Sequence, residues 1–376
     1  MAKLDRDTSQ GRPRVLFAGG GTGGHLYPAI AIADALRARG ATIAFVGSAD
    51  RLEARIVPEA GYPLHAISGG PLRRRLGFDT VRTIVANGAG TLQSLSLLQR
   101  ARPDIVIATG GYVCFPVVIA ARMLSLSRQR RCAIALLEPN ARPGLTNRML
   151  APLVDEVWGA FGDDDSRFAG KYVRTGVPVR ATLLSLPPRD AALAAFGLRP
   201  EKKTLLAMGG SQGARTINDA LVAIVAAGTL PPGWQLLLVS GDRDFERVRA
   251  AMPTGAAVVP YVTDPAAAYA AADLVIARAG ASTLAELSAV GKPAILVPYP
   301  FAAGDHQTAN AMRFAQSGAA VVIADRDLGN GLHGAVAAAA ERVESLHAAA
   351  AGLRGADPVA TILARVDWLT ARRDAA

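Results

Sequence analysis

Short apolar segments alternate with alanine- and leucine-rich stretches of helical character along nearly the whole chain. Near-continuous apolar strands separated by helices are typical of parallel sheets that helices cover on both faces. This pattern predicts an α/β fold. The expected strands read RVLFA, TIAFVG, DIVIATG, CAIALLE and DEVWGAF in the first half, and TLLAMGG, WQLLLVSG, AAVVPYV, DLVIARAG, PAILVPYP and AAVVIA in the second.

Both halves open in the same way, with an apolar strand, a glycine-rich turn and the start of a helix: VLFAGGGTGGH from residue 15 and LLAMGGSQGAR from residue 205. A length of 376 residues also favours two domains, each large enough to bury its own core. We therefore expect two Rossmann-like domains whose parallel sheets face each other across a cleft. The proposed boundaries are 1–180 and 181–355, with a final helix in 356–376 that packs back toward the first domain.

Composition indicates a protein of a reducing compartment. Cys114 and Cys132 are the only cysteines, too few for a disulfide framework. The N-terminus lacks an apolar leader, and the longest apolar runs are about ten residues, short of the roughly twenty that span a bilayer. Asp163, Asp164 and Asp165 are expected to form a solvated loop or helix start rather than a metal site. We expect no metal and no other cofactor.

The positive charge is unevenly distributed. Residues 1–180 hold 24 lysines and arginines against 14 acids, whereas residues 181–376 hold 17 of each. A basic half suggests an anionic partner. Arg73, Arg74 and Arg75 stand beside apolar residues, as in a segment that contacts a membrane surface, although a solvated loop fits equally well. Nucleic acid is not expected, since no interleaved aromatic residues or reading module accompany the arginines.

The first glycine turn satisfies G-x-G-x-x-G with Gly19, Gly21 and Gly24. Such a turn lets the backbone approach a phosphate at a helix N-terminus. A nicotinamide enzyme would also need an acid at the end of the second strand, and Asp50 comes several residues too late. His25, at the start of the helix, could act as a base or donate to a phosphate, or it could be a polar residue without chemistry.

The second glycine turn, GGSQG at residues 209–213, also matches the G-x-S-x-G nucleophile elbow. Ser211 followed by His306 could imitate a hydrolase triad. However, the chain has no HGGG-type oxyanion segment, and a second diphosphate-binding loop explains the same residues.

The segment 277–311 is the richest in candidate site residues. We expect Glu286 to be an exposed acid in the first turn of a helix, where it could bind a ribose diol; simple complementarity to the helix dipole is the alternative. Gln307 and His306 follow the next strand and could reach sugar hydroxyls of the same ligand.

Together these motifs resemble those of the peptidoglycan N-acetylglucosaminyltransferases of glycosyltransferase family 28, which have the two-domain GT-B architecture. The resemblance implies an inverting transfer of N-acetylglucosamine from UDP-N-acetylglucosamine to the 4-hydroxyl of undecaprenyl-diphospho-muramoylpentapeptide. It also implies a peripheral enzyme at the cytoplasmic face of the inner membrane. The resemblance is carried by GGGTGGHLYPA, GSADRLEARIVPEAGY, TGGYV, EPNARPGLTNR, GVPVR, GGSQGARTIND, RAGASTLAE and GDHQTANA, which run from about residue 14 to 322.

By position, the family's roles fall on a defined set of residues. His25 is the preferred catalytic base and Glu138 the second choice. Tyr112 and the three arginines 73–75 would serve the acceptor and the membrane. The UDP-N-acetylglucosamine site would comprise Thr22, Gly23, Gly24, Asn140, Arg180, Ser211, Val262, Ala281, Ser282, Thr283, Glu286 and Gln307.

One position departs from the family pattern. The family commonly reads His-Glu-Gln-Asn where this chain has Leu137 to Asn140, so a histidine is missing. Three other interpretations stay open at this point: a nicotinamide oxidoreductase, a non-catalytic relative that binds a lipid carrier, and a transferase with a different acceptor, such as another lipid or a macrolide.

Overall fold

The computed structural model describes residues 12–71, 78–126, 132–161, 168, 170–210, 213–253 and 255–374. The chain forms two compact units. Unit 1 comprises residues 1–178 together with 356–376, and unit 2 comprises residues 179–355.

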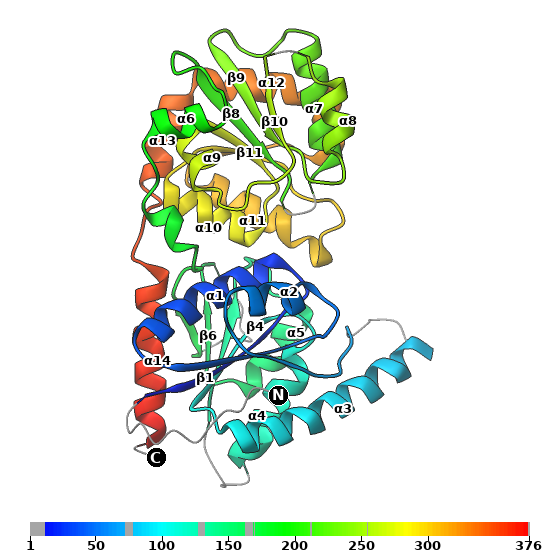
Figure 1. Ribbon diagram of the computed structural model, residues 1–376, viewed down its shortest axis with the longest axis vertical. Helices are drawn as coiled ribbons and strands as arrows, with labels where there is room; N and C mark the ends of the chain where they lie inside the picture. Colours follow the sequence, from blue (N-terminus) through cyan, green and yellow to red (C-terminus); the bar gives the residue numbers. More distant parts are fainter. Residues whose placement is uncertain are drawn as a thin grey trace. The chain divides into compact units, whose positions relative to one another are not determined.

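Unit 1 is built on a seven-stranded sheet (Figure 1). Its strands are β1 (Arg14–Gly19), β2 (Thr42–Gly47), β3 (Leu64–Ala66), β4 (Ile105–Gly110), β5 (Ala133–Glu138), β6 (Glu156–Gly159) and β7 (Tyr172–Arg174). Their order is β3-β2-β1-β4-β5-β6-β7, and every pair is parallel. The predicted parallel α/β architecture is confirmed, although the short edge strands β3 and β7 were not predicted.

Helices cover both faces of this sheet. They are α1 (Gly23–Ala38), α2 (Leu52–Glu59), α3 (Phe78–Ala101), α4 (Cys114–Leu126), α5 (Leu145–Leu150), the short 3-10 helix η1 (Ala151–Leu153) and α14 (Pro358–Asp374). Alternate strand residues face opposite ways. Phe17 and Phe45 pack with α1, α2 and α14, whereas Leu16 and Val46 pack with α3, α4 and α5. Two apolar layers therefore hold the sheet.

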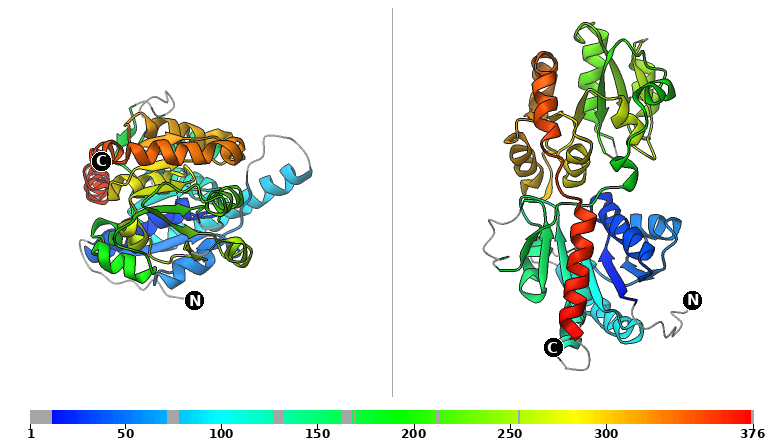
Figure 2. Two further views of the ribbon diagram at one scale, coloured as in Figure 1. Left: turned by 90° about the horizontal axis from the view of Figure 1, so that it is seen from above. Right: turned by 90° about the vertical axis from the view of Figure 1, so that its left-hand side faces the viewer.

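The last helix, α14, belongs to unit 1 even though the chain reaches it only after passing through unit 2. It runs along the sheet of unit 1 beside α1 (Figure 2, red). Its buried face joins the same apolar layer as α1, and Arg365 binds the buried carboxylate of Glu156. Glu156 also accepts a hydrogen bond of 2.7 Å from the indole Nε1 of Trp158. The apolar residues of α14 in this layer are Ile362, Leu363, Val366 and Leu369.

Unit 2 repeats the plan with six parallel strands. They are β8 (Lys203–Met208), β9 (Trp234–Val239), β10 (Ala257–Val259), β11 (Leu274–Ala277), β12 (Ala294–Leu296) and β13 (Ala320–Val322). Their order is β10-β9-β8-β11-β12-β13. In both units the first strand lies next to the second on one side and the fourth on the other, which creates the switch point where doubly wound sheets bind ligands.

The helices of unit 2 also form two layers. They are η3 (Ala181–Leu184), α6 (Arg189–Ala195), α7 (Arg215–Ala226), α8 (Phe245–Ala251), α9 (Ala266–Ala271), α10 (Ala281–Val290), η4 (Ala303–Asp305), α11 (His306–Ala315), η5 (Asp325–Asp327), α12 (Leu328–Glu341) and α13 (Val343–Ala351). One layer contains α6, α9, α10 and α11, and the other contains α7, α8 and α12. Among the helices in the described ranges, none is both long and apolar enough to cross a membrane.

Candidate functional site

His25 lies in the first turn of α1, directly after the glycine turn that ends β1. Its Nδ1 is 3.1 Å from the carbonyl oxygen of Gly20 and 3.4 Å from the hydroxyl of Thr22. A carbonyl oxygen can only accept, so the hydrogen bond to Gly20 requires the proton on Nδ1. The lone pair is then on Nε2. This is the tautomer that a general base needs.

The imidazole ring rests against Gly110, the last residue of β4. A Cβ atom at position 110 would lie 2.7 Å from Cδ2 and 2.8 Å from Nε2 of His25. Gly110 also has φ of +110°, a conformation that residues with side chains rarely adopt. The glycine in TGGYV is therefore required beside the ring, a role that the sequence analysis did not assign to it.

Glu53, on α2, is a buried polar residue near the glycine turn that the sequence analysis did not single out. Its side chain is fully buried, with 0% of the residue exposed. Oε2 accepts a hydrogen bond of 2.8 Å from the backbone N–H of Gly21, and Oε1 accepts one of 2.9 Å from that of Ser48. The carboxylate thus joins the turn after β1 to the turn after β2. No sequence motif identifies Glu53, because its hydrogen-bond partners, Gly21 and Ser48, come close to it only in the folded protein.

Glu138, the last residue of β5, is also buried, with 2% exposed. Oε1 accepts from the backbone N–H and the side-chain Nδ2 of Asn140, at 3.0 and 3.1 Å. Oε2 accepts from the backbone N–H of Gly144 and from Nδ2 of Asn147, both at 2.9 Å. Four donors occupy the acceptor sites of this carboxylate. The arrangement favours a role in holding Asn140 over a role as the base.

Leu137, where the family commonly carries histidine, is fully buried. Its side chain joins the apolar layer beneath α1 and α14.

Tyr112 follows β4, and its hydroxyl lies 2.7 Å from that of Ser48. Because β1, β4 and β5 are parallel, their ends bring His25, Tyr112 and Glu138 to one edge of the sheet.

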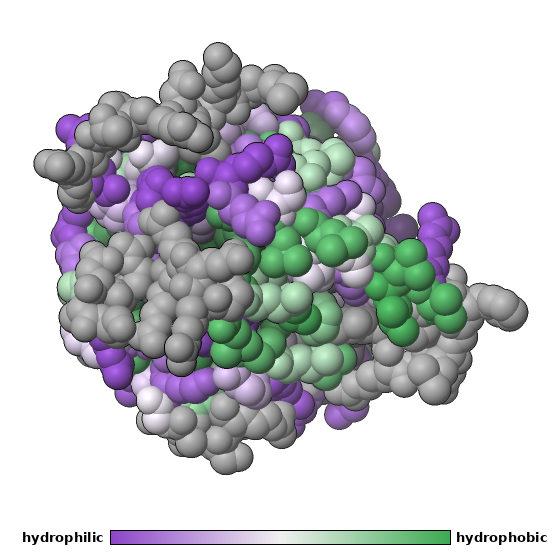
Figure 3. Space-filling model, turned by 90° about the horizontal axis from the view of Figure 1, so that it is seen from below, coloured by the Kyte–Doolittle hydropathy of each residue, from purple (hydrophilic) through white to green (hydrophobic). Residues whose placement is uncertain are grey.

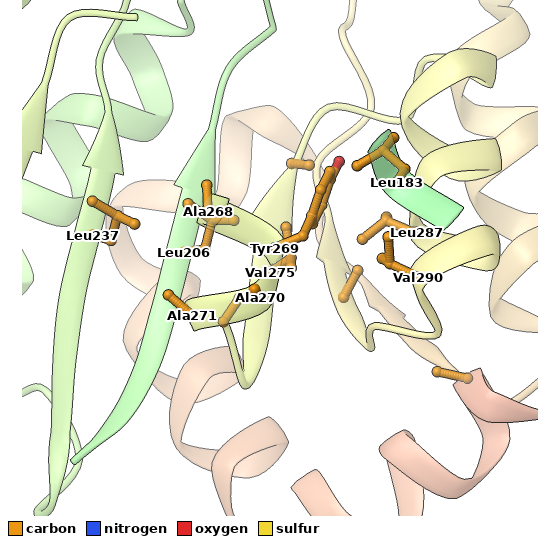
Figure 4. Packing of buried hydrophobic residues seen from close by; sticks show 14 of the residues in the cluster. Leu183, Leu206, Leu237, Ala268, Tyr269, Ala270, Ala271, Val275, Leu287 and Val290 are labelled. Carbon is orange, nitrogen blue, oxygen red and sulfur yellow. The ribbon is translucent and has the colours of Figure 1, made fainter. Parts of the chain in front are cut away.

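In unit 2, Glu286 lies in the second turn of α10 and is partly buried, so the prediction of an exposed acid in the first turn is wrong. The helix begins at Ala281, earlier than expected. The hydroxyl of the fully buried Tyr269 donates a hydrogen bond of 2.9 Å to Oε2 of Glu286. Figure 4 shows the ring of Tyr269 packed near Leu183 and Leu287.

Two opposing effects act on the Glu286 carboxylate. Burial raises its pKa above the ordinary value, while the hydrogen bond from Tyr269 and the charge of Arg180 act in the opposite direction. Within the described part of the chain, Tyr269 supplies the one hydrogen bond to this carboxylate, and Oε1 receives none. Oε1 is therefore available to accept from a ligand hydroxyl.

Two residues at the start of unit 2 hold the loop that precedes α9. Arg180 donates to the carbonyl of Thr263 at 2.6 Å, and the hydroxyl of Thr182 donates to Asp264 at 2.9 Å. This loop carries Val262, the residue to which the resemblance assigns a backbone contact with the base of the nucleotide.

The first turn of α10 contains Ala281, Ser282 and Thr283. Just before it, the carbonyl of Ala279 accepts a hydrogen bond of 3.2 Å from the buried side chain of Asn310, on α11. Asn310 thereby fixes the strand-to-helix turn that presents the N-terminus of α10.

Gln307 is the second residue of α11. Its Oε1 accepts from the backbone N–H of Tyr299 at 2.9 Å, which orients the amide so that Nε2 can donate. His306, its neighbour, places Nδ1 2.8 Å from the carbonyl of Ala303. Since β11 leads into α10 and β12 into α11, Glu286 and Gln307 lie at the same edge of the second sheet.

Arg278, in RAGAS, is a further residue that the sequence analysis missed. Its guanidinium contacts Asp325 at 2.5 Å and donates to the hydroxyl of Thr216 at 2.9 Å. The arginine thereby ties the end of β11 to the start of α7.

Several predicted residues lie outside the described residues: Arg73, Arg74, Arg75, Asp163, Asp164, Asp165 and Ser211. In the described ranges, no group of three or more histidine, cysteine, aspartate or glutamate residues is placed to hold a metal ion.

Comparison with known proteins places the chain in a family. Residues 15–158 match the glycosyltransferase family 28 N-terminal domain, and residues 204–360 match the glycosyltransferase family 28 C-terminal domain. Together these matches cover most of the chain. The protein therefore belongs to glycosyltransferase family 28.

Eight curated relatives share one name, UDP-N-acetylglucosamine--N-acetylmuramyl-(pentapeptide) pyrophosphoryl-undecaprenol N-acetylglucosamine transferase. The protein of that name from Desulforudis audaxviator is 43% identical over 86% of this chain and 89% of its own length. The one from Chlorobium luteolum is 41% identical over 93% and 97%.

Solved structures agree with this placement. MurG of Acinetobacter baumannii is 27% identical, with a TM-score of 0.73 over 95% of this chain and 99% of its own. The glycosyltransferase of kitacinnamycin, at 18% identity and a TM-score of 0.67 over 94% and 99%, shares the fold alone.

Burial of Glu286 leads to a prediction about stability and pH. A carboxyl whose pKa is raised in the folded state destabilises that state wherever it is ionised. We expect Glu286→Gln to raise the midpoint of thermal unfolding at pH 7, because the amide removes the buried charge and still accepts from Tyr269. The gain should vanish below the ordinary pKa of glutamate, where both states are protonated. Calorimetry between pH 4 and pH 8 checks this, and a lower midpoint for the variant at pH 7 contradicts it.

Proposed function

We propose that this protein transfers N-acetylglucosamine from UDP-N-acetylglucosamine to the 4-hydroxyl of N-acetylmuramyl-(pentapeptide) pyrophosphoryl-undecaprenol, the step that converts lipid I to lipid II in peptidoglycan synthesis. The transfer would serve cell-wall formation and thereby cell shape and division. The observation that carries the proposal is identity above 40% with transferases of that name over most of the chain. The proton on Nδ1 of His25 and the open Oε1 of Glu286 support the proposal.

In this proposal unit 2 binds the donor. The free Oε1 of Glu286 accepts from the ribose hydroxyls, and the backbone near Val262 contacts the uracil. Ala281, Ser282 and Thr283 line the nucleotide at the start of α10, where N–H groups and the helix dipole favour negative charge. Arg180 lies near the diphosphate, which the GGSQG turn with Ser211 contacts. Nε2 of Gln307 donates to a hydroxyl of N-acetylglucosamine.

Unit 1 would bind the acceptor and supply the base. The 4-hydroxyl oxygen of the muramoyl unit forms a bond to the anomeric carbon as the bond from that carbon to UDP breaks, which inverts the configuration. The hydroxyl proton moves to Nε2 of His25, and UDP leaves with the electron pair. Thr22, Gly23, Gly24 and Asn140 would contact the sugars from this unit, with Glu138 holding Asn140. Tyr112 would contact the acceptor.

The test of this function is release of UDP with and without a short-chain lipid carrying muramoylpentapeptide. We expect acceptor-dependent release and a disaccharide product identified by mass. Tight binding of UDP-N-acetylglucosamine without release would indicate another acceptor or a non-catalytic relative. Protection against thermal unfolding by NAD but not by UDP-sugars would favour an oxidoreductase.

The role of His25 gives a second prediction. We expect His25→Ala to lower kcat by about 10²- to 10⁴-fold, the usual contribution of a positioned base. Donor affinity should stay within about twofold, because unit 2 binds the donor. Steady-state kinetics and titration with UDP-N-acetylglucosamine measure both. Turnover near that of the wild type would remove His25 from the mechanism.

An apolar stripe on α3 supports a peripheral location at the cytoplasmic face of the inner membrane. Val81, Ile84, Val85 and Leu92 recur at helical spacing and are each more than 60% exposed. On the neighbouring helix α4, Leu126 is 75% exposed. Figure 3 shows apolar side chains gathered in a band on this side of unit 1. An exposed apolar helix that follows a basic segment in the sequence suits an anionic membrane.

The third prediction concerns this stripe. We expect the double variant Ile84→Ser and Val85→Ser to bind phosphatidylglycerol vesicles roughly tenfold more weakly or worse, since two apolar side chains no longer enter the lipid. Vesicle co-sedimentation measures the affinity. Leu184→Ser, which alters an exposed leucine of unit 2, is the matched control and should bind as the wild type does.

Replacing Arg73, Arg74 and Arg75 by serine tests the electrostatic contribution to vesicle binding, which should also weaken. If neither the Ile84/Val85 variant nor the arginine variant binds the vesicles more weakly than the wild type does, a membrane role is contradicted.

A further inference from the structure

We propose that Glu53 is a positioning residue for His25, and that it acts through the peptide bond that joins Gly20 to Gly21. This inference rests on the proposed role of His25 as the base. It assigns to the reaction a carboxylate on α2 that does not itself contact the imidazole.

The two ends of one peptide group carry the connection. The N–H of Gly21 donates to Oε2 of Glu53 at 2.8 Å, and the C=O of Gly20 faces Nδ1 of His25 at 3.1 Å. In a trans peptide the N–H and C=O point in opposite directions within one plane. The carboxylate therefore holds one side of the peptide group while the imidazole binds the other. Rotation of this peptide would break both hydrogen bonds.

Packing around Glu53 accounts for two glycines that the phosphate-binding pattern leaves unexplained. Gly20 is not one of the three glycines of the G-x-G-x-x-G match, and neither Gly20 nor Gly47 has a positive φ. A Cβ at position 20 would lie 2.3 Å from Oε1 of Glu53, and a Cβ at position 47 would lie 2.6 Å from its Cγ. Both positions must lack a side chain because the carboxylate of Glu53 occupies the space at position 20 and its Cγ occupies the space at position 47.

The second oxygen of Glu53 limits its movement. Oε1 accepts from the N–H of Ser48 at 2.9 Å, and the hydroxyl of Ser48 in turn contacts Tyr112. The side chain is thus held between the turns that follow β1 and β2. A buried carboxylate with two backbone donors is a fixed negative charge in a region of low dielectric constant.

This charge acts on His25 in two ways. It polarises the Gly20–Gly21 peptide, which strengthens the carbonyl as an acceptor and favours the proton on Nδ1. It also stabilises the imidazolium that forms when Nε2 takes the acceptor proton, as a carboxylate does when it binds a catalytic histidine directly. In the described part of the chain, the ionisable groups near the ring include Glu53, Tyr112 and Cys114, and Glu138 at the end of β5 shares the same sheet edge. Burial raises the pKa of the Cys114 thiol to about 12, so it stays neutral.

The experiment compares Glu53→Gln with Glu156→Gln. Glu156 is another buried carboxylate of unit 1, but it binds Arg365 and Trp158 and lies outside the catalytic machinery. We expect Glu53→Gln to lower kcat by about 10- to 100-fold and to leave the KM for UDP-N-acetylglucosamine within about twofold. The acidic limb of the pH–rate profile should move to lower pH by roughly half a unit. Glu156→Gln should lower the unfolding temperature without moving the limb.

Two further measurements distinguish a positioning role of Glu53 from a purely structural one. In the His25→Ala background, Glu53→Gln should cost little additional activity, because the residue it positions is absent. Nitrogen-15 spectra of histidine-labelled protein should show His25 as the Nδ1–H tautomer in the wild type and a mixture in Glu53→Gln. An unmoved limb together with an unchanged tautomer would overturn the inference even if kcat falls. The spectra need no turnover, so they test Glu53 even if acceptor-dependent release of UDP is not found and the proposed function fails.

Discussion

Parallel pairing of every strand is the constraint on which the rest of the structure depends. In a parallel sheet all strands end at the same edge, so the segments that follow them are brought together whatever their separation in the sequence. In unit 1 this edge gathers His25, Tyr112 and Glu138, which lie 113 residues apart at the extremes. In unit 2 it gathers Glu286 and Gln307. The remaining structure, two apolar layers on each sheet, serves to keep these edges fixed.

Three buried or partly buried glutamates differ in how many donors they bind, and the difference separates their roles. Glu138 accepts four hydrogen bonds, and Glu53 accepts two from backbone N–H groups. In Glu138 and in Glu53, both carboxylate oxygens accept hydrogen bonds from the protein itself. Glu286 accepts one, from Tyr269. A carboxylate held at one oxygen and open at the other is oriented for a ligand and still able to bind it, at the expense of stability in the empty protein.

Much of the fold could be predicted because its signals are local. Runs such as TIAFVG and WQLLLVSG show burial on both faces, and the glycine turns show where a strand gives way to a helix. Strands β3 and β7 escaped prediction because LHA and YVR carry a polar residue and form no apolar run, unlike the equally short AVV and AIL of β10, β12 and β13. His25 could be singled out from its position at a helix start. Glu53 could not, since its partners Gly21 and Ser48 come from two turns that only the folded sheet brings together. Glu286 lies one turn later in α10 than expected, because the helix already begins at Ala281.

The placement of α14 has a consequence for how the chain folds as it is synthesised. The apolar layer beneath α1 stays open until residues near Ile362 and Val366 leave the ribosome, and until then Glu156 lacks the arginine that neutralises it. Roughly 200 residues separate the end of the first sheet from α14, which at about 5–20 residues per second is a delay on the order of ten to forty seconds. During that time unit 2 can complete its own core. Unit 2 is thus the first unit that can finish folding, because unit 1 depends on a helix that emerges only after the whole of unit 2.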